Sequence, residues 1–144
     1  MHFDESERRD FVDRWVEVWN TSAGTRDSLA FYTEDAELVD RASNLTYRGH
    51  EELYAYFRYT EEILCDFHVS SQQVLVAPSH AVVHLRFEAT IKKPFLCLPT
   101  TSRGKRISLY MMSLLEFAED GRIARGTDVY DRASALRQLG VLPG

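Results

Sequence analysis

Residues 81–91, AVVHLRFEATI, alternate between two kinds of side chain. Successive residues of an extended strand point to opposite faces of a sheet, so the alternation predicts a strand. One of its faces carries the apolar set Ala81, Val83, Leu85, Phe87 and Ala89. That set must be buried, and we therefore expect His84, Arg86 and Glu88 to lie in solvent or in a dimer interface.

The same period continues on both sides of this segment. Residues 67–77, 106–117 and 122–130 are predicted to be strands, and residues 36–40 fit a shorter one. Asp120-Gly121 between the last two long strands is a favoured hairpin turn. The second half of the chain therefore predicts an antiparallel sheet.

The first half has a helical period instead. Residues 4–20 place Phe11, Trp15 and Trp19 on one side of a helix, and a long helix follows Gly49. A short helix is expected over residues 28–32, and a last one between the N-cap Asp131 and the stop Gly140. Helices followed by strands give an α+β fold with the helices on one face of the sheet.

Length, charge and hydropathy exclude several classes of partner. The chain has 144 residues, which fits one domain over residues 1–144, and its net charge is −5. The only basic cluster, residues 103–106, is too small for a nucleic-acid or anionic-membrane partner. No apolar run is long enough to span a membrane and the N-terminus lacks a signal peptide, so we expect a cytoplasmic protein.

Most common catalytic motifs are missing. The five histidines have no metal-ligand spacing, and neither a Gly-rich phosphate loop nor a serine nucleophile elbow is present. Cys65 and Cys97 form no CxxC pair and are expected to be small buried groups. The sequence thus predicts no metal and no cofactor.

Carboxylates in apolar settings remain as candidates. Alternation groups Asp128 with Ala124, Gly126 and Tyr130, and these small neighbours would leave room for a ligand. An exposed strand end is the alternative for Asp128. Asp40 closes the short strand predicted over residues 36–40 and could be catalytic or a turn or cap residue.

Aromatic side chains could line a pocket for a flat ligand. They are Trp15, Trp19, Tyr56 and Phe57. Aromatic residues at helical spacing are more often plain core, and that is the alternative here.

Two regions resemble a known family. Phe31-Tyr32-Thr33-Glu34-Asp35-Ala36-Glu37-Leu38-Val39-Asp40 resembles the helix-to-strand segment of the nuclear transport factor two-like superfamily. The run from Asp120-Gly121-Arg122-Ile123 through Asp128-Val129-Tyr130-Asp131 to Gln138-Leu139-Gly140 is similar to its SnoaL-like polyketide cyclase branch.

The resemblance implies a cone-shaped fold, in which a curved mixed sheet wraps around three N-terminal helices and encloses an apolar pocket, usually in a dimer. Asp128 corresponds to the acid/base aspartate of the cyclases. Their polar strand residues, a histidine and a glutamine, correspond to Ser113 and Met111. Asp40 corresponds to the proton-shuttling aspartate of ketosteroid isomerases, whose oxyanion tyrosine corresponds to Trp15.

We therefore predict a cofactor-independent cyclase that acts on a small hydrophobic carbonyl compound. Asp128 would be its acid and base, and Met111, Ser113 and Tyr130 would contact the substrate together with the four aromatic residues. The alternatives are isomerase- or dehydratase-like proton transfer through Asp40, and a dimeric module that only binds a small ligand.

Overall fold

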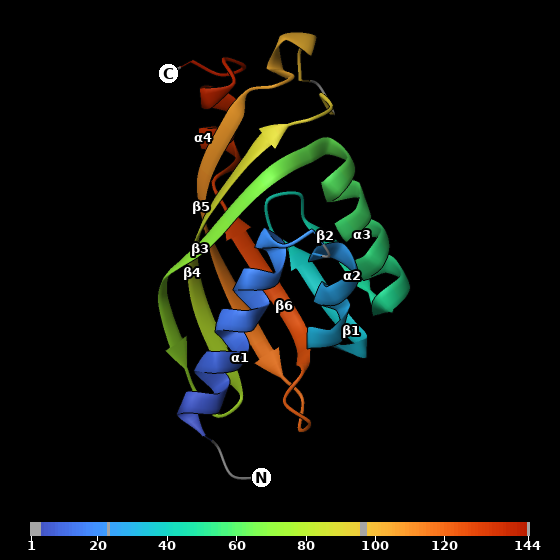
Figure 1. Ribbon diagram of the computed structural model, residues 1–144, viewed down its shortest axis with the longest axis vertical. Coiled ribbons are helices and arrows are strands. Elements are labelled where there is room, and N and C mark those ends of the chain that lie inside the picture. The colour runs from blue at the N-terminus through green and yellow to red at the C-terminus, as the bar shows by residue number, and fades with distance from the viewer. Residues whose placement is uncertain (1–3, 23, 96–97, 144) are drawn as a thin grey trace.

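A six-stranded sheet with the order β2-β1-β6-β5-β4-β3 forms the frame of the protein (Figure 1). The computed structural model describes residues 4–22, 24–95 and 98–143. The strands are β1 (Tyr32–Asp40), β2 (Leu45–Arg48), β3 (Leu64–Val76), β4 (His80–Ile91), β5 (Arg106–Phe117) and β6 (Ile123–Tyr130). β1 pairs with β6 in parallel and the other neighbours are antiparallel, so the sheet is mixed.

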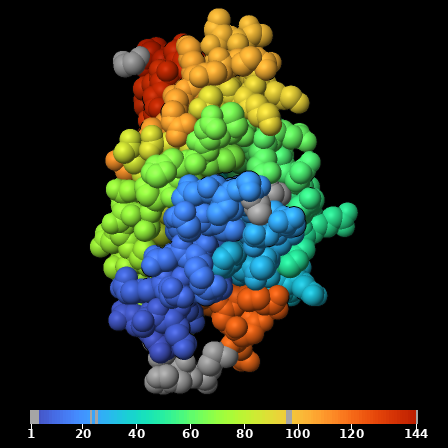
Figure 2. Space-filling view, viewed as in Figure 1, coloured from blue at the N-terminus to red at the C-terminus, as the bar shows by residue number. Residues whose placement is uncertain are grey.

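Three helices cover one face of this sheet and lie side by side in the space-filling view (Figures 1 and 2). They are α1 (Glu5–Glu17), α2 (Gly24–Ser28) and α3 (Gly49–Ile63). Asp4 caps α1, since its carboxylate accepts a hydrogen bond from the backbone N–H of Glu7. In the described part of the chain, no helix is both long enough and apolar enough to cross a membrane.

The main core lies between these helices and the covered face of the sheet. It joins Val12 and Trp15 of α1 and Leu53 and Phe57 of α3 to apolar residues of the strands. A second cluster packs Leu139, at the end of α4 (Arg132–Gln138), against the far end of β4 and β5. Asp131 caps α4 through the backbone N–H of Ser134, as predicted.

The other face of the sheet has no cover of its own in the described chain. Alternation along β4 is as predicted, because Val83 and Leu85 are buried whereas Arg86 is exposed and His84 is half-buried. Large apolar side chains are exposed on this outer face across several strands. We call this set the outer apolar patch: Leu75, Tyr110, Met112, Leu114 and Val129.

The fold class is confirmed, and the boundaries differ in the first half. The short helix predicted over residues 28–32 begins earlier, as α2 and a 3₁₀ turn at Leu29–Phe31, because Tyr32 already pairs with β6. β1 is correspondingly longer than residues 36–40, and β2 falls where a loop was expected. Cys65 is half-buried, and Cys97 lies outside the described residues.

Candidate active site

Asp40, Asp128 and Ser113 form one row across three neighbouring strands. Asp40 of β1 is the register partner of Asp128 of β6, which is also the register partner of Ser113 of β5. Register partners project their side chains from the same face of a sheet. The topology therefore places the two predicted carboxylates side by side, next to a serine hydroxyl.

Asp128 has one engaged and one available carboxylate oxygen. The Ser113 hydroxyl donates to its Oδ1 over 2.6 Å, and no described residue donates to Oδ2. Burial is the main cause that raises the pKa of Asp128 to about 6, since it disfavours the charged form. The Ser113 hydrogen bond opposes this rise, and the charge of Asp40 adds to it.

Asp40 differs from Asp128 in that both of its oxygens are engaged. Its Oδ1 accepts the backbone N–H groups of Ala42 and Ser43 over 2.9 and 3.2 Å, which is the predicted turn role. Its Oδ2 accepts the Tyr130 hydroxyl over 3.0 Å. With a side chain that is only 4% exposed, Asp40 is held as a structural acceptor.

Four tyrosines surround this pair of carboxylates. Tyr130 donates to Asp40, and the guanidinium of Arg132 interacts with its phenol. Tyr56 stacks on Tyr47, with ring centroids 4.3 Å apart. Burial is the main cause of the raised pKa values of Tyr56 and Tyr32, and the charge of Asp128 adds to both.

The remaining predicted aromatic residues belong to the core. Trp15 is 7% exposed, and its indole N–H donates to the Tyr32 hydroxyl over 3.0 Å. The Trp19 ring lies edge-on to Phe57, which is 3% exposed. Met111 is half-buried and is the register partner of Tyr130.

The space expected beside Asp128 at Gly126 is filled, which corrects the sequence interpretation. A Cβ added to Gly126 would lie 3.2 Å from Leu38 Cδ1 and 3.8 Å from Leu115 Cδ2. Leu38 is the register partner of Gly126 on β1, so the small residue serves close packing between strands.

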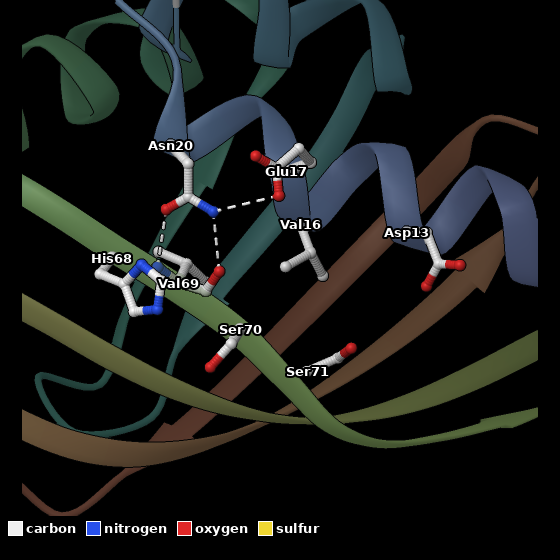
Figure 3. A pocket seen from close by; sticks show the side chains of 8 residues that line it. All are labelled: Asp13, Val16, Glu17, Asn20, His68, Val69, Ser70 and Ser71. Carbon is white, nitrogen blue, oxygen red and sulfur yellow. Dashed lines mark hydrogen bonds between the residues drawn. The ribbon is translucent and has the colours of Figure 1, made fainter.

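Neither of two hollows on the surface of the described residues is lined by Asp128. The larger, of about 410 Å³, lies between α1 and β3 and has polar walls that include Asp13, Glu17 and His68 (Figure 3). Asn20 closes one side by hydrogen bonds in both directions with the backbone of Val69. The smaller, of about 250 Å³, is lined by Tyr47, Glu52, Ala55, Tyr56 and Tyr59; we call it the tyrosine cleft.

Tyr32 and Tyr47 belong to the site although their sequence context did not single them out. Tyr47 lies on β2, and the β-branched and aromatic pair Thr46-Tyr47 before Gly49 is a weak strand signal. Tyr32 lay inside a predicted helix. Only its position at the start of β1, opposite Trp15 of α1, reveals its contact with the site.

Replacement of Asp128 by asparagine is expected to stabilise the protein at neutral pH. The pKa of Asp128 is about 6 in the fold against an ordinary value of 3.8, so its ionisation weakens the fold as pH rises from about 4 to about 6. Asp128→Asn removes this cost, about 1–3 kcal/mol above pH 7, and its amide oxygen still accepts from Ser113.

The measurement is urea unfolding of both proteins at several pH values. The stability advantage of Asp128→Asn should be absent near pH 4, grow as pH rises and be complete above about pH 6. Asp131→Asn, which keeps a good helix cap, should show no such trend. A difference between Asp128→Asn and the parent that stays constant with pH would contradict the raised pKa.

The arrangement suits proton transfer. A half-buried carboxylate with a pKa near 6 and one available oxygen can take a proton from a weak carbon acid and return it. Over the described ranges, no group of three His, Cys, Asp or Glu side chains is placed to hold a metal ion.

Comparison with known proteins identifies the family. The model of the SnoaL-like polyketide cyclase family matches residues 9–139. No curated protein gives a significant match.

Solved structures share the fold at low sequence identity. A protein of Jannaschia sp. CCS1, assigned as a SnoaL-like polyketide cyclase, is 18% identical with a TM-score of 0.82, over 99% of each chain. TsrD of Streptomyces laurentii is 22% identical with a TM-score of 0.80, over 98% of this chain and 100% of its own. A protein of Catenulispora acidiphila with a ketosteroid isomerase-like fold is 21% identical with a TM-score of 0.77, over 92% and 94%. Because the family model matches residues 9–139, which is most of the chain, this chain belongs to the SnoaL-like polyketide cyclase family.

Proposed function

We propose that the protein is a cofactor-independent enzyme that moves a proton on a small hydrophobic carbonyl compound, with Asp128 as its acid and base. This proposal rests on the hydrogen bonding and the pKa of the Asp128 carboxyl group. Ser113 holds one carboxylate oxygen, the other is available, and burial raises the pKa of the group to about 6. A base of this strength is ionised at neutral pH and is stronger than an ordinary aspartate.

In the cyclase form of the reaction, the Asp128 carboxylate takes an α-proton from the substrate. The electrons of the broken C–H bond stay on the substrate, which becomes an enolate. The α-carbon of this enolate then attacks a second carbonyl of the same molecule and forms a carbon–carbon bond. The resulting alkoxide takes the proton back from Asp128. The reaction needs no other proton donor, acceptor or oxidant, because the proton moves only between the substrate and Asp128. The pocket would hold the substrate folded so that the enolate carbon lies close to the second carbonyl.

The alternative with Asp40 as the base has less support. Three donors engage the Asp40 carboxylate, so a substrate would have to displace one of them. Asp40 instead adds negative charge beside Asp128 and helps to raise its pKa. A module that only binds a ligand would need none of these features of Asp128.

The test is α-proton exchange in deuterium oxide, followed by NMR on a panel of enolisable ketones and polyketide-like methyl esters. Exchange reports the first proton transfer whether or not the bond-forming step follows. We expect the protein to catalyse exchange on at least one member. If it catalyses none but binds some of the compounds, the ligand-binding module is the better account.

We also propose that the protein is a homodimer that pairs through the outer apolar patch. This patch spans β3, β5 and β6, and its members are between 38 and 56% exposed. A monomer rarely leaves such an extended apolar area in water, and a sheet face can pair with itself about a two-fold axis. The half-buried His84, whose ring lies 5.4 Å from that of Tyr110, would then lie in the interface.

Met112→Glu should convert the dimer to a monomer. Met112 is 46% exposed within the patch, and a charge buried against a second copy would lack a partner. Light scattering should give about twice the 16.6 kDa chain mass for the parent and the single mass for the variant. Tyr54→Glu is the control, because Tyr54 is 41% exposed on α3, away from the sheet. A monomeric parent would rule the dimer out.

A further inference from the structure

The hydrogen-bond donors around the two carboxylates differ in whether their protons are already engaged. The Ser113 hydroxyl donates to Asp128, the Tyr130 hydroxyl donates to Asp40, and the Trp15 indole N–H donates to Tyr32. A substrate carbonyl that becomes an enolate needs a donor of its own, because negative charge grows on its oxygen. Each of these three donors would have to break its present hydrogen bond before it could donate to the substrate carbonyl.

The phenol protons of Tyr32, Tyr47 and Tyr56 have no acceptor among the described residues. Tyr32 is only 2% exposed and lies in the main core, so a ligand cannot reach its hydroxyl. Tyr47 and Tyr56 both line the tyrosine cleft, where a ligand can meet them. The choice therefore falls between the two stacked rings.

Tyr56 lies over the sheet face that carries both carboxylates. Tyr47 of β2 is the register partner of Leu38, which shares a face of β1 with Asp40, and Tyr56 stacks on Tyr47. Burial is the main cause that raises the pKa of Tyr56 well above its usual value, and the charges of Asp128 and Asp40 add to this rise. Burial also raises the pKa of Tyr47, and of the two carboxylates only Asp40 adds to it. Tyr56 is therefore the ring of the pair that is better placed to contact a substrate at Asp128 from the tyrosine cleft.

We propose that Tyr56 is a catalytic residue that donates a hydrogen bond to the substrate carbonyl oxygen, and that the substrate enters through the tyrosine cleft. This inference rests on the proposed function, in which Asp128 takes the α-proton of the same substrate. The hydrogen bond strengthens as the enolate forms, so the donor stabilises the transition state more than the bound ketone. The apolar walls of the cleft fit a flat hydrophobic compound with one carbonyl.

The test uses 2-naphthol as a probe of the enolate. The complex of neutral naphthol with ionised Asp128 contains the same number of protons as the complex of an enolate with protonated Asp128. Titration calorimetry at pH 7 should show binding to the parent, and Tyr56→Phe should weaken it roughly tenfold or more. Phenylalanine keeps the ring that stacks on Tyr47, so the melting temperature should change little.

Tyr54→Phe is the matched control, since it removes a phenol hydroxyl from the same helix at a side chain that is 41% exposed and does not line the tyrosine cleft. Its naphthol affinity should stay within about twofold of the parent. Equal affinities of Tyr56→Phe and the parent would overturn the proposal. So would a loss of affinity in Tyr47→Phe that Tyr56→Phe does not show, or a parent that does not bind naphthol.

The exchange assay separates this inference from the proposed function. If Asp128→Asn abolishes α-proton exchange while Tyr56→Phe leaves exchange and naphthol affinity unchanged, the role of Tyr56 fails and that of Asp128 stands. If the parent exchanges no α-protons but naphthol affinity still depends on Tyr56, the proton-transfer function fails. Tyr56 then stands as a ligand donor of a binding site.

Discussion

Asp128→Asn is expected to lower the rate of α-proton exchange by roughly 100- to 10,000-fold, which is the usual contribution of a positioned general base. An amide keeps the shape of the carboxylate and can still accept the Ser113 hydrogen bond, but it cannot take a proton. In the parent, the rate should rise with pH up to about 6 and then level off, because Asp128 must be ionised to act.

Asp131→Asn is the control for this result. Asp131 lies three positions along the same segment but caps α4 instead of facing Asp40, and asparagine caps helices equally well. Its exchange rate should match that of the parent. If Asp128→Asn exchanged at the rate of the parent, the base would have to be another group, and Asp40→Asn would be the next variant to measure.

Trp15→Ala is expected to lower the free energy of unfolding by about 3–5 kcal/mol, as large-to-small changes at buried aromatic positions do. The ring fills the space between α1 and the covered face of the sheet. Its loss also removes the N–H donor to Tyr32, which is one of the few polar contacts inside the core. Urea denaturation at pH 7 measures the change.

Tyr54→Ala is the matched control for stability. Tyr54 lies on α3 with 41% of its surface exposed, so its truncation should change the free energy of unfolding by less than about 0.5 kcal/mol. A Trp15→Ala protein that unfolds at the same urea concentration as the parent would mean that α1 does not dock through this ring.

Local periodicity was sufficient to predict most of the sheet. Alternation predicts strands at residues 81–91 and 106–117, and within residues 81–91 it also gives the buried face, because every second side chain meets the core. β1 and β2 were harder to predict. β1 begins with polar residues after Tyr32, and β2 has four residues, so neither carries a clear period.

In the candidate site, too, local patterns predicted some features, whereas others depend on contacts between segments far apart in the sequence. Alternation placed Asp128 on the face of Gly126 and Tyr130, whereas Ser113 came from the family resemblance. That Asp40 lies beside Asp128 follows only from the parallel pairing of β1 with β6, which joins segments far apart in sequence. The raised pKa of Asp128 and the engaged state of Asp40 depend on that pairing, so the sequence left the two aspartates as alternatives.

The most direct measurement is the carbon-13 NMR titration of the Asp128 carboxyl carbon, identified as the aspartate resonance that disappears in Asp128→Asn. The account requires a carboxylate that burial has made basic enough for proton transfer. It predicts a titration midpoint near pH 6, from the raised pKa of Asp128. A midpoint near the ordinary value of 3.8 would contradict it, because Asp128 would then be an ordinary solvated carboxylate and a poor base.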